Sequence, residues 1–508
     1  MQGEMGSDEG GLYRSRLGRG MDEEALSYLS SLSDDREILL DDLEGTEAHV
    51  IMLYEQKIIS KDEAAKIVEV LEELREKALR GEIKLEGEFE DVHEFIEAYV
   101  VKKLGVEVGG KLHTGRSRND QIALDIRLRV RRYLLELWEA GLKLAEAFLS
   151  KAREEYDTLM LHYTHLQQAQ IGYVSQYLLA HLDHLLRDLE RIESCYHRVN
   201  RSPLGACAIA GSTLPLNRMR VAELLGFEGL VENSVDAVSS RDFALEALSA
   251  ASIMMINLSR VAEDLIIWSS SEFDYVELPD ELASPSSVMP HKKNPCILEL
   301  LRAKTGKVIG LLTASLTLMK GIPTGYDRDL QEGKPLIWEA LRESCRSVRI
   351  MAKVIKRIRF KRDKLLESVA KSYAPAIELA EALIKHSGLS LREAHQLVGA
   401  FVKRLHESKI LLRSSRLEDL QELAEEVLGR GISLPEEAFR EVIRADRVPR
   451  LRLTRGSAHP EEVRRQIEER DKLLKEHSSR LHEVLKNLSE SRGKFKESLS
   501  LLLSRSTA

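Results

Sequence analysis

Aromatic residues, prolines and long hydrophobic runs are all scarce in this sequence. Phenylalanine, tryptophan and tyrosine together make up 5% of its 508 residues. No apolar run approaches the roughly 20 residues that a helix needs to span a bilayer. The first residues also lack the charged start and apolar centre of a signal peptide. These absences argue against membrane and secreted proteins, so we expect a cytoplasmic location and no membrane partner.

Cysteines and blocks of like charge are scarce as well. The chain has four cysteines, with neither a CxxC pair nor a cysteine–histidine spacing typical of zinc sites: Cys195, Cys207, Cys296 and Cys345. We therefore expect free thiols and no metal. The net charge of -8 arises from interspersed charges of both signs. Since no basic patch stands out, we expect no nucleic-acid partner.

The distribution of proline favours long helices. None of the 12 prolines precedes Pro203, and none lies between Pro215 and Pro279. Because proline interrupts a helix, these segments can be helical throughout. An apolar stripe with steps of three or four residues predicts one long helix: Ile122, Ile126, Val130, Leu134, Leu137, Gly141, Leu144 and Phe148. Further long helices are predicted at about 159–200, 240–271, 295–318 and 335–359.

Five long helices can bury their apolar stripes only against one another. The sequence therefore predicts an all-α fold built around a central bundle of long helices. A helix of ~30 residues is ~45 Å long, which is more than a compact domain of this size requires. Part of the apolar surface is therefore expected to meet other subunits.

The chain divides into five predicted segments. A flexible glycine-rich arm at 1–20 precedes a small helical domain at 21–111. The long-helix bundle is expected at 112–363 and a second small helical domain at 364–459. In the last segment, 460–508, apolar residues recur every seven positions: Ile467, Leu474, Leu481, Leu488, Phe495 and Leu502. Most intervening residues are charged or serine, so we expect this helix to pack along a neighbouring helix.

The stretch LASPSSVMPHKKNPCILELLRAKT, residues 282–305, combines a loop with the start of a helix. Pro285, Pro290 and Pro295 cannot share a helix, so the segment between them is predicted to be a loop. Asn294 is then a suitable N-cap and Pro295 a suitable first helical residue. Lysines and serine hydroxyls stand beside this helix N-terminus, which makes it a candidate anion site. The alternative is an ordinary capped helix with solvated lysines and serines.

Five other polar stretches are candidate site segments: SSLSDDRE at 30–37, GKLHTGRSRNDQ at 110–121, HYTHLQQAQ at 162–170, SSRD at 239–242 and TGYDRDLQEGK at 324–334. Each also has an ordinary interpretation as a helix cap, a polar loop or a turn, the second with Asn119 or Asp120 as cap. Thr164 and His165 are expected at a helix start, where a histidine is often simply packed. His162 and His165 are three residues apart, but no cysteine or carboxylate completes a metal site.

The block SSVMPHKKNP resembles the signature of the fumarase/aspartase superfamily, whose members eliminate fumarate from a substituted succinate. GKLHTGRSRNDQ and YTHLQ resemble the argininosuccinate lyase family in particular, and the resemblance extends over about residues 21–467. It implies a fumarase/aspartase-like, tetramer-forming fold in which three subunits of a homotetramer build each site. It also implies an enzyme of arginine biosynthesis that cleaves argininosuccinate to L-arginine and fumarate by β-elimination, without a metal or organic cofactor.

The resemblance also implies roles for individual residues. Ser286 matches the catalytic base, with Ser287 as the alternative, and Lys292 supports the charged intermediate. His165, or a water that it holds, takes part in proton transfer and is oriented by Glu299. The residues that the resemblance implies in substrate binding are Ser31, Ser117, Arg118, Asn119, Thr164, Arg241, Ser287, Asn294, Tyr326, Gln331 and Lys334, with Asp35 beside Ser31 in a matching position.

The chemistry of elimination explains these residue types. Removing a proton next to a carboxylate places a second negative charge on that carboxylate, and preorganised N–H groups, amides and a lysine can stabilise this dianion. A serine can act as the base only if its alkoxide is stabilised by the same positive groups. Two alternatives stay open: another fumarate-releasing lyase such as adenylosuccinate lyase, and a crystallin-like structural protein on the same fold.

Overall fold

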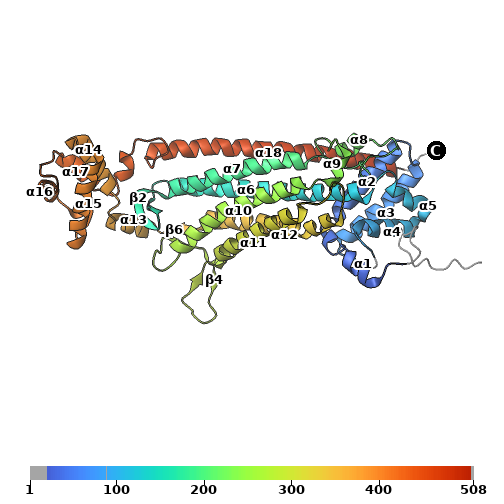
Figure 1. Cartoon of the computed structure of the whole chain (residues 1–508), viewed down its shortest axis with the longest axis horizontal. Coiled ribbons are helices and arrows are strands. Elements are labelled where there is room, and N and C mark those ends of the chain that lie inside the picture. The colour runs from blue at the N-terminus through green and yellow to red at the C-terminus, as the bar shows by residue number, and fades with distance from the viewer. Residues whose placement is uncertain (1–19, 87–88, 505–508) are drawn as a thin grey trace, which may run out of the picture.

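Helices dominate the computed structural model, which describes residues 20–86 and 89–504 (Figure 1). Five long helices run along the longest axis of the molecule: α6 (Arg118–Glu154), α7 (Val174–Val199), α10 (Asp242–Trp268), α11 (Cys296–Met319) and α12 (Gly333–Arg357). The all-α fold with a central bundle is therefore confirmed. Of the predicted arm at 1–20, all but Gly20 lies outside the described residues. Among the described residues, no helix is long and apolar enough to cross a membrane.

Helix α6 shows how the sequence specifies the bundle. Its N-cap is Ser117, which forms a capping box with Asp120; the cap therefore lies two residues before the expected Asn119. The predicted apolar stripe is buried, and Leu134, Leu137 and Phe148 are almost fully inaccessible to solvent. Burying a side chain of this size contributes about 1.5–3 kcal/mol, so the stripe holds α6 in the centre of the bundle against α7 and α12.

Shorter helices cover one end of the bundle, where α6 and α12 begin (Figure 1). They are α1 (Glu23–Leu29), the 3-10 turn η1 (Asp34–Glu37), α2 (Leu39–Glu55), α3 (Lys61–Leu79), α4 (Val92–Leu104), α5 (Val106–Gly109) and the 3-10 turn η2 (Gly110–His113). The apolar residues of α2, α3 and α4 join those of the long helices in one hydrophobic cluster. Helix α2 thereby packs against α6.

The segment between α6 and α7 is a β-hairpin, so the long helix predicted at 159–200 begins only at Val174. Strand β1 (Leu159–Thr164) pairs antiparallel with β2 (Gln167–Tyr173). Leu161 and Ile171 are buried together against Val369 of a later helix, and this packing outweighs the helical spacing of the sequence. Thr164 and His165 therefore lie at a hairpin tip, and the prediction that they start a helix was wrong.

The loop before α11 contains a second, smaller hairpin. Strands β4 (Ser284–Pro285) and β5 (Lys293–Asn294) pair antiparallel, so Asn294 lies in a strand and Pro295 occupies the N-cap position. The prediction of Asn294 as the cap and Pro295 as the first helical residue was therefore off by one position. Figure 1 shows that this hairpin, residues 284–294, which we call the lid hairpin, stands out from the body of the molecule.

Several short elements connect the long helices: α8 (Arg218–Leu224), α9 (Ser234–Ser239), β3 (Val276–Glu277), η3 (Asp280–Leu282), η4 (Arg328–Glu332) and β6 (Arg359–Phe360). Strand β3 pairs with β6. Within the polar stretch 324–334, residues from Arg328 onwards form η4 and then the first turn of α12. Lys334 is consequently a helical residue.

The opposite end of the molecule carries a second group of short helices (Figure 1). These elements are α13 (Arg362–Lys371), α14 (Ala376–Ser387), α15 (Leu391–Glu407), η5 (Leu412–Ser414), α16 (Leu417–Leu428), α17 (Glu436–Val442) and η6 (Val448–Leu451). Phe401 and Phe439 are buried at the centre of a separate hydrophobic cluster that spans residues 379–443.

Helix α18 (Pro460–Leu503) returns along the whole bundle and packs on α6 and α7 (Figure 1). Most of the seven-residue apolar repeat is buried in this contact, namely Ile467, Leu474, Leu481, Phe495 and Leu502. The prediction of a helix packed along a neighbouring helix is confirmed.

Candidate functional site

A polar cleft of about 460 Å³ lies where the short N-terminal helices meet the starts of α6 and α12. It is lined by Ser31, Glu90, Asp91, His93, His113, Ser117, Arg118, Asn119, Ile122, Tyr326, Arg328, Gln331 and Lys334. Seven of the residues predicted from the sequence are in this set: Ser31, Ser117, Arg118, Asn119, Tyr326, Gln331 and Lys334. The chain thus brings together three predicted stretches, at Ser31, at 117–119 and at 326–334, and the first and last of these are about 300 residues apart in sequence.

Lys334 is deeply buried at the cleft, with 3% of its side chain exposed. Its Nζ donates to the Ser31 hydroxyl at 3.0 Å and pairs with the carboxylate of Asp35. Ser31 in turn donates to Asp35 at 2.8 Å. Gln331, one helical turn before Lys334, donates to the Leu29 carbonyl. These bonds fix an ammonium, a hydroxyl and an amide at one end of the cleft.

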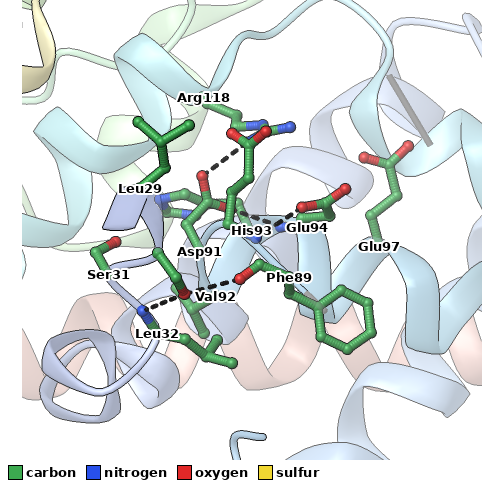
Figure 2. Close-up of polar contacts among 12 residues, drawn as sticks. Leu29, Ser31, Leu32, Phe89, Asp91, Val92, His93, Glu94, Glu97 and Arg118 are labelled. Carbon is green, nitrogen blue, oxygen red and sulfur yellow. Dashed lines mark hydrogen bonds and ion pairs between the residues drawn. The ribbon is translucent and has the colours of Figure 1, made fainter. Parts of the chain in front are cut away.

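Arg118 and Asn119, at the start of α6, also line the cleft. The Arg118 guanidinium donates to Asp91 at 2.9 Å, and Figure 2 shows the two side chains lying together beside His93. Burial alone would raise the pKa of Asp91, but the charges of His93 and Arg118 hold it below its usual value. The Asn119 amide donates to the Ala208 carbonyl at 3.0 Å. The side chains beside the N-terminus of α6 are thus held in place for an anionic ligand.

Arg241, another predicted binding residue, lies behind Tyr326. It is 4% exposed, and it donates to the carbonyls of Val238 and Ser240. Its Nε and Nη2 have no hydrogen-bond partner among the described residues. Burial lowers the pKa of Arg241 to about 10 and raises that of the Tyr326 phenol. Arg241 is therefore next to the cleft, although it does not line it.

The sequence analysis missed several residues of this cleft. Glu90, Asp91 and His93 lie at the start of α4, where Asp91 is the N-cap. A usable signal was present, because an aspartate cap with polar residues on the following turn resembles the start of the other site helices. His113 and Arg328 belong to the polar stretches 110–121 and 324–334, but the sequence did not single them out as site residues. Burial and the nearby Arg116 lower the pKa of His113 to about 3, so this imidazole is neutral.

The lid hairpin carries the second group of predicted residues, away from the cleft. The Ser286 Oγ accepts hydrogen bonds from the backbone N–H groups of Met289 at 3.0 Å and Val288 at 3.4 Å. Lys292 and Ser287 are exposed, and so is Glu299 on the first turn of α11. The Asn294 amide approaches the Pro285 carbonyl at 3.5 Å. The hydroxyl proposed as a base thus stands among backbone donors, on a hairpin that one chain leaves uncovered.

Thr164 and His165 form the third group, at the tip of the β1–β2 hairpin. Both are exposed, and His165 and Leu166 adopt positive φ angles of 55° and 57°. This left-handed conformation is uncommon for residues other than glycine and is often found at functional turns. A second cavity, of about 750 Å³, adjoins the tip and is lined by residues that include Tyr163, Leu166 and Gln167. Within the described part of one chain, His165 and Glu299 make no hydrogen bond to each other.

One chain keeps these three groups apart. Helix α6 has 37 residues and so is ~55 Å long; it begins at the cleft and ends just before the β1–β2 hairpin. Helix α11 has 24 residues and so is ~36 Å long; it begins at the lid hairpin and ends near Gly333, beside the cleft. In Figure 1, strands β4 and β2 both lie well to the left of the short N-terminal helices α2 to α5. A site that uses all three groups must therefore combine different chains.

Known proteins share both the sequence and the fold. Residues 31–310 match the lyase family, and residues 373–448 match the argininosuccinate lyase C-terminal family. The chain is 45% identical to the argininosuccinate lyase of Nitrosopumilus maritimus, over 78% of this chain and 81% of that protein. It is 44% identical to that of Methanothrix thermoacetophila, over 93% and 95%.

Solved structures of related lyases have the same fold. EDDS lyase in complex with formate superposes with a TM-score of 0.86 at 28% identity, covering 95% of this chain and 96% of that one. The class II fumarase of Schistosoma mansoni has a TM-score of 0.66 at 19% identity, over 81% and 90%, which shows a shared fold.

The long-helix bundle and these similarities define a lyase of the fumarase/aspartase superfamily. Within that superfamily, the chain belongs to the argininosuccinate lyase family.

Proposed function

We propose that this protein cleaves argininosuccinate to L-arginine and fumarate by β-elimination, as an enzyme of arginine biosynthesis in the cytoplasm. The observation that supports this most strongly is the cleft itself. It brings a buried lysine and a hydroxyl, Lys334 and Ser31, together with the start of α6, which carries Arg118 and Asn119. Argininosuccinate carries several carboxylates, so it suits a cleft with several anion-binding groups.

The reaction follows from placing the lid and the hairpin tip over this cleft. Ser286 takes a proton from the carbon next to a succinate carboxylate, and the electron pair is first held on that carboxylate as a dianion. The pair then forms the new double bond as the adjacent C–N bond breaks. The departing guanidino nitrogen receives a proton through His165 or a water that it holds. Lys292, Asn294, Thr164 and Asn119 stabilise the dianion that forms before the C–N bond breaks.

The arginine end of the substrate occupies the other half of the cleft. Ser31, Tyr326, Gln331 and Lys334 offer a hydroxyl, a phenol, an amide and an ammonium there. Ser117 and Arg118 contact the succinate end, Arg241 supports Tyr326, Glu299 orients His165, and Ser287 assists Ser286.

We further propose a homotetramer in which three subunits contribute to each site. The separation of the three groups supports this, and so do large apolar side chains that α10 and α11 expose to solvent in one chain. Ile253 and Ile256 of α10 are 39% and 42% exposed, and Ile309 and Leu316 of α11 are 38% and 48% exposed. Ile309 and Leu316 are seven residues apart and share one helix face. Exposed apolar surface of this kind marks a subunit interface.

A fumarate-release assay tests the function. Purified protein is given argininosuccinate or adenylosuccinate in parallel, and fumarate is measured. We expect fumarate from argininosuccinate only. Fumarate from adenylosuccinate alone would indicate the other lyase, and no turnover of either substrate by a well-folded tetramer would indicate a structural role on this fold.

A further inference from the structure

A buried cluster of ionisable groups lies directly behind the cleft. His93, on the first turn of α4, lines the cleft and is 4% exposed. Its Nδ1 lies 3.0 Å from Oδ2 of Asp42 on α2 and 3.7 Å from Oδ2 of Asp125 on α6. Both aspartates are fully buried. The three residues come from three helices, so the fold, not local sequence, assembles the cluster.

The two aspartates have different environments. Asp42 Oδ1 accepts hydrogen bonds from Gln121 at 2.7 Å and Thr46 at 3.1 Å, and Oδ2 faces His93. In contrast, neither oxygen of Asp125 has a hydrogen-bond partner among the described residues. An ionised carboxylate without donors is costly to bury, so the negative charge of the cluster is more stable on Asp42 than on Asp125.

The electrostatics of the cluster agree with this assignment. Burial, together with the charges of Asp42 and Asp41, raises the pKa of Asp125 well above its usual range. Burial alone would lower the pKa of His93, but the charge and hydrogen bond of Asp42 outweigh it and raise that pKa. Other ionisable groups that face the cluster are Asp35 from η1, Asp41 from α2, Asp91 at the start of α4, His113 from η2 and Arg116 from the loop before α6.

Only one of the two ring nitrogens of His93, Nδ1, contacts Asp42. The other, Nε2, is buried and has no hydrogen-bond partner among the described residues. An unpartnered N–H in a side chain that lines a ligand cleft costs free energy until a ligand accepts from it. A divalent cation between the three side chains is the other conceivable occupant, because their ligand atoms lie within 4.8 Å of one another. The buried guanidinium of Arg116 beside Asp42 disfavours such an ion.

We propose that His93 binds a carboxylate of the substrate as an imidazolium, through Nε2–H, and that Asp42 is the positioning residue that keeps His93 protonated and oriented. This inference rests on the proposed function, because it takes argininosuccinate as the ligand of the cleft. Asp42 fixes Nδ1–H by accepting its proton, which leaves Nε2–H for the ligand. Asp125 fills the remaining space beside the ring without adding a second charge.

The test measures KM and kcat for argininosuccinate as a function of pH in His93→Gln and Asp42→Asn. The His93→Gln substitution removes a hydrogen bond between charged groups. KM should therefore rise roughly 10- to 100-fold, with a smaller change in kcat. Asp42→Asn should move the alkaline fall of kcat/KM to lower pH, because the imidazolium loses its counter-charge. Asp125→Asn should leave that alkaline fall in place, since the carboxyl is already neutral.

A buried aspartate far from the cleft provides the matched control. Asp188 on α7 is 1% exposed and is hydrogen-bonded to Asn257; Asp188→Asn should keep KM and the pH profile of the parent. If Asp42→Asn fails to fold, the KM of His93→Gln still tests whether His93 binds the substrate, because His93 lines the cleft. An unchanged KM in folded His93→Gln would overturn the proposal.

A stoichiometric divalent metal in the purified protein, lost in Asp125→Asn, would also overturn it in favour of a metal site. A parent protein that releases no fumarate would instead contradict the proposed function, so the two failures are distinguishable.

Discussion

At the scale of single residues, the buried pair of Lys334 and Asp35 carries a clear prediction. Both side chains are almost inaccessible to solvent, so Lys334→Met leaves an uncompensated carboxylate inside the protein. We expect the free energy of unfolding to fall by about 3 kcal/mol or more, measured by urea denaturation at fixed protein concentration. Lys292→Met, at an exposed lysine of the lid, is the control and should change stability by less than about 0.5 kcal/mol. Equal effects of the two substitutions would contradict this account.

Ser286 is the residue on which the proposed chemistry depends. Replacing it with alanine removes the base but leaves the cleft intact, so kcat should fall by at least about 100-fold. Stability and substrate binding should change little, because Ser286 lies on the exposed lid hairpin. The check is steady-state fumarate release together with binding of argininosuccinate to the inactive variant. Turnover within a few-fold of the parent would show that Ser286 is not the base.

His49 makes stability depend on pH. It is buried, its Nε2–H donates to the Thr114 carbonyl at 2.8 Å, and burial lowers its pKa from 6.5 to about 3. Between pH 6.5 and 3, His49 is therefore protonated in the unfolded chain but neutral in the folded chain. The free energy of unfolding is not reduced by His49 above pH 6.5, and it falls as the pH is lowered towards 3. His49→Gln retains an N–H donor but removes the titration. The slope of unfolding free energy against pH in this window should fall by about 1.4 kcal/mol per pH unit; an unchanged slope would refute the assignment.

Sequence reasoning placed many of the site residues in the right stretches and missed their partners. The polar stretches around Asn119 and Lys334 are readable because they interrupt apolar repeats. Asp42 and Asp125 are not, since each lies inside an ordinary helical pattern, and His93 is marked only by the aspartate cap that precedes it. Their proximity depends on how α2, α4 and α6 pack, and one sequence does not contain that information.

At the scale of elements, α18 tests whether the seven-residue repeat stabilises the bundle. Leu481 is 5% exposed where α18 packs on the bundle, whereas Leu485, one turn further on, is 45% exposed. We expect Leu481→Ala to cost about 2–5 kcal/mol and Leu485→Ala to stay within about 0.5 kcal/mol. Turnover at low temperature should be unchanged in both, because none of the proposed site residues lies on α18. A similar cost for both substitutions would mean that α18 is not docked in this orientation.

Helices were predictable wherever a stripe of apolar residues continued over several turns, as from Ile122 to Phe148. The β1–β2 hairpin was not, because its leucines fit a helical spacing as well as an alternating one. Contacts with α13 decide between the two structures, and these contacts join residues about 200 positions apart in sequence. The lid hairpin was recognised as irregular from its prolines, but its short strand pairing was not foreseen.

At the scale of the whole molecule, the length of the helices determines how a site can be built. The cleft lies tens of ångströms from the β1–β2 tip along α6 and from the lid hairpin along α11, and α10 and α11 expose apolar side chains. Antiparallel packing of several bundles would bury those side chains and bring the cleft of one chain to the lid and the tip of others. The proposed tetramer and the proposed shared site would then both depend on the same helix length.

The most direct test mixes two inactive variants, Asn119→Ala in the cleft and Ser286→Ala in the lid. Co-expression with two different affinity tags yields mixed tetramers, and their fumarate release is compared with that of each variant alone. If the cleft and the lid of one site come from different subunits, about a quarter of the sites in an equal random mixture contain both intact residues. We therefore predict recovery of roughly a quarter of the parent activity. Mixed tetramers that remain as inactive as the two variants alone would contradict a site shared between subunits.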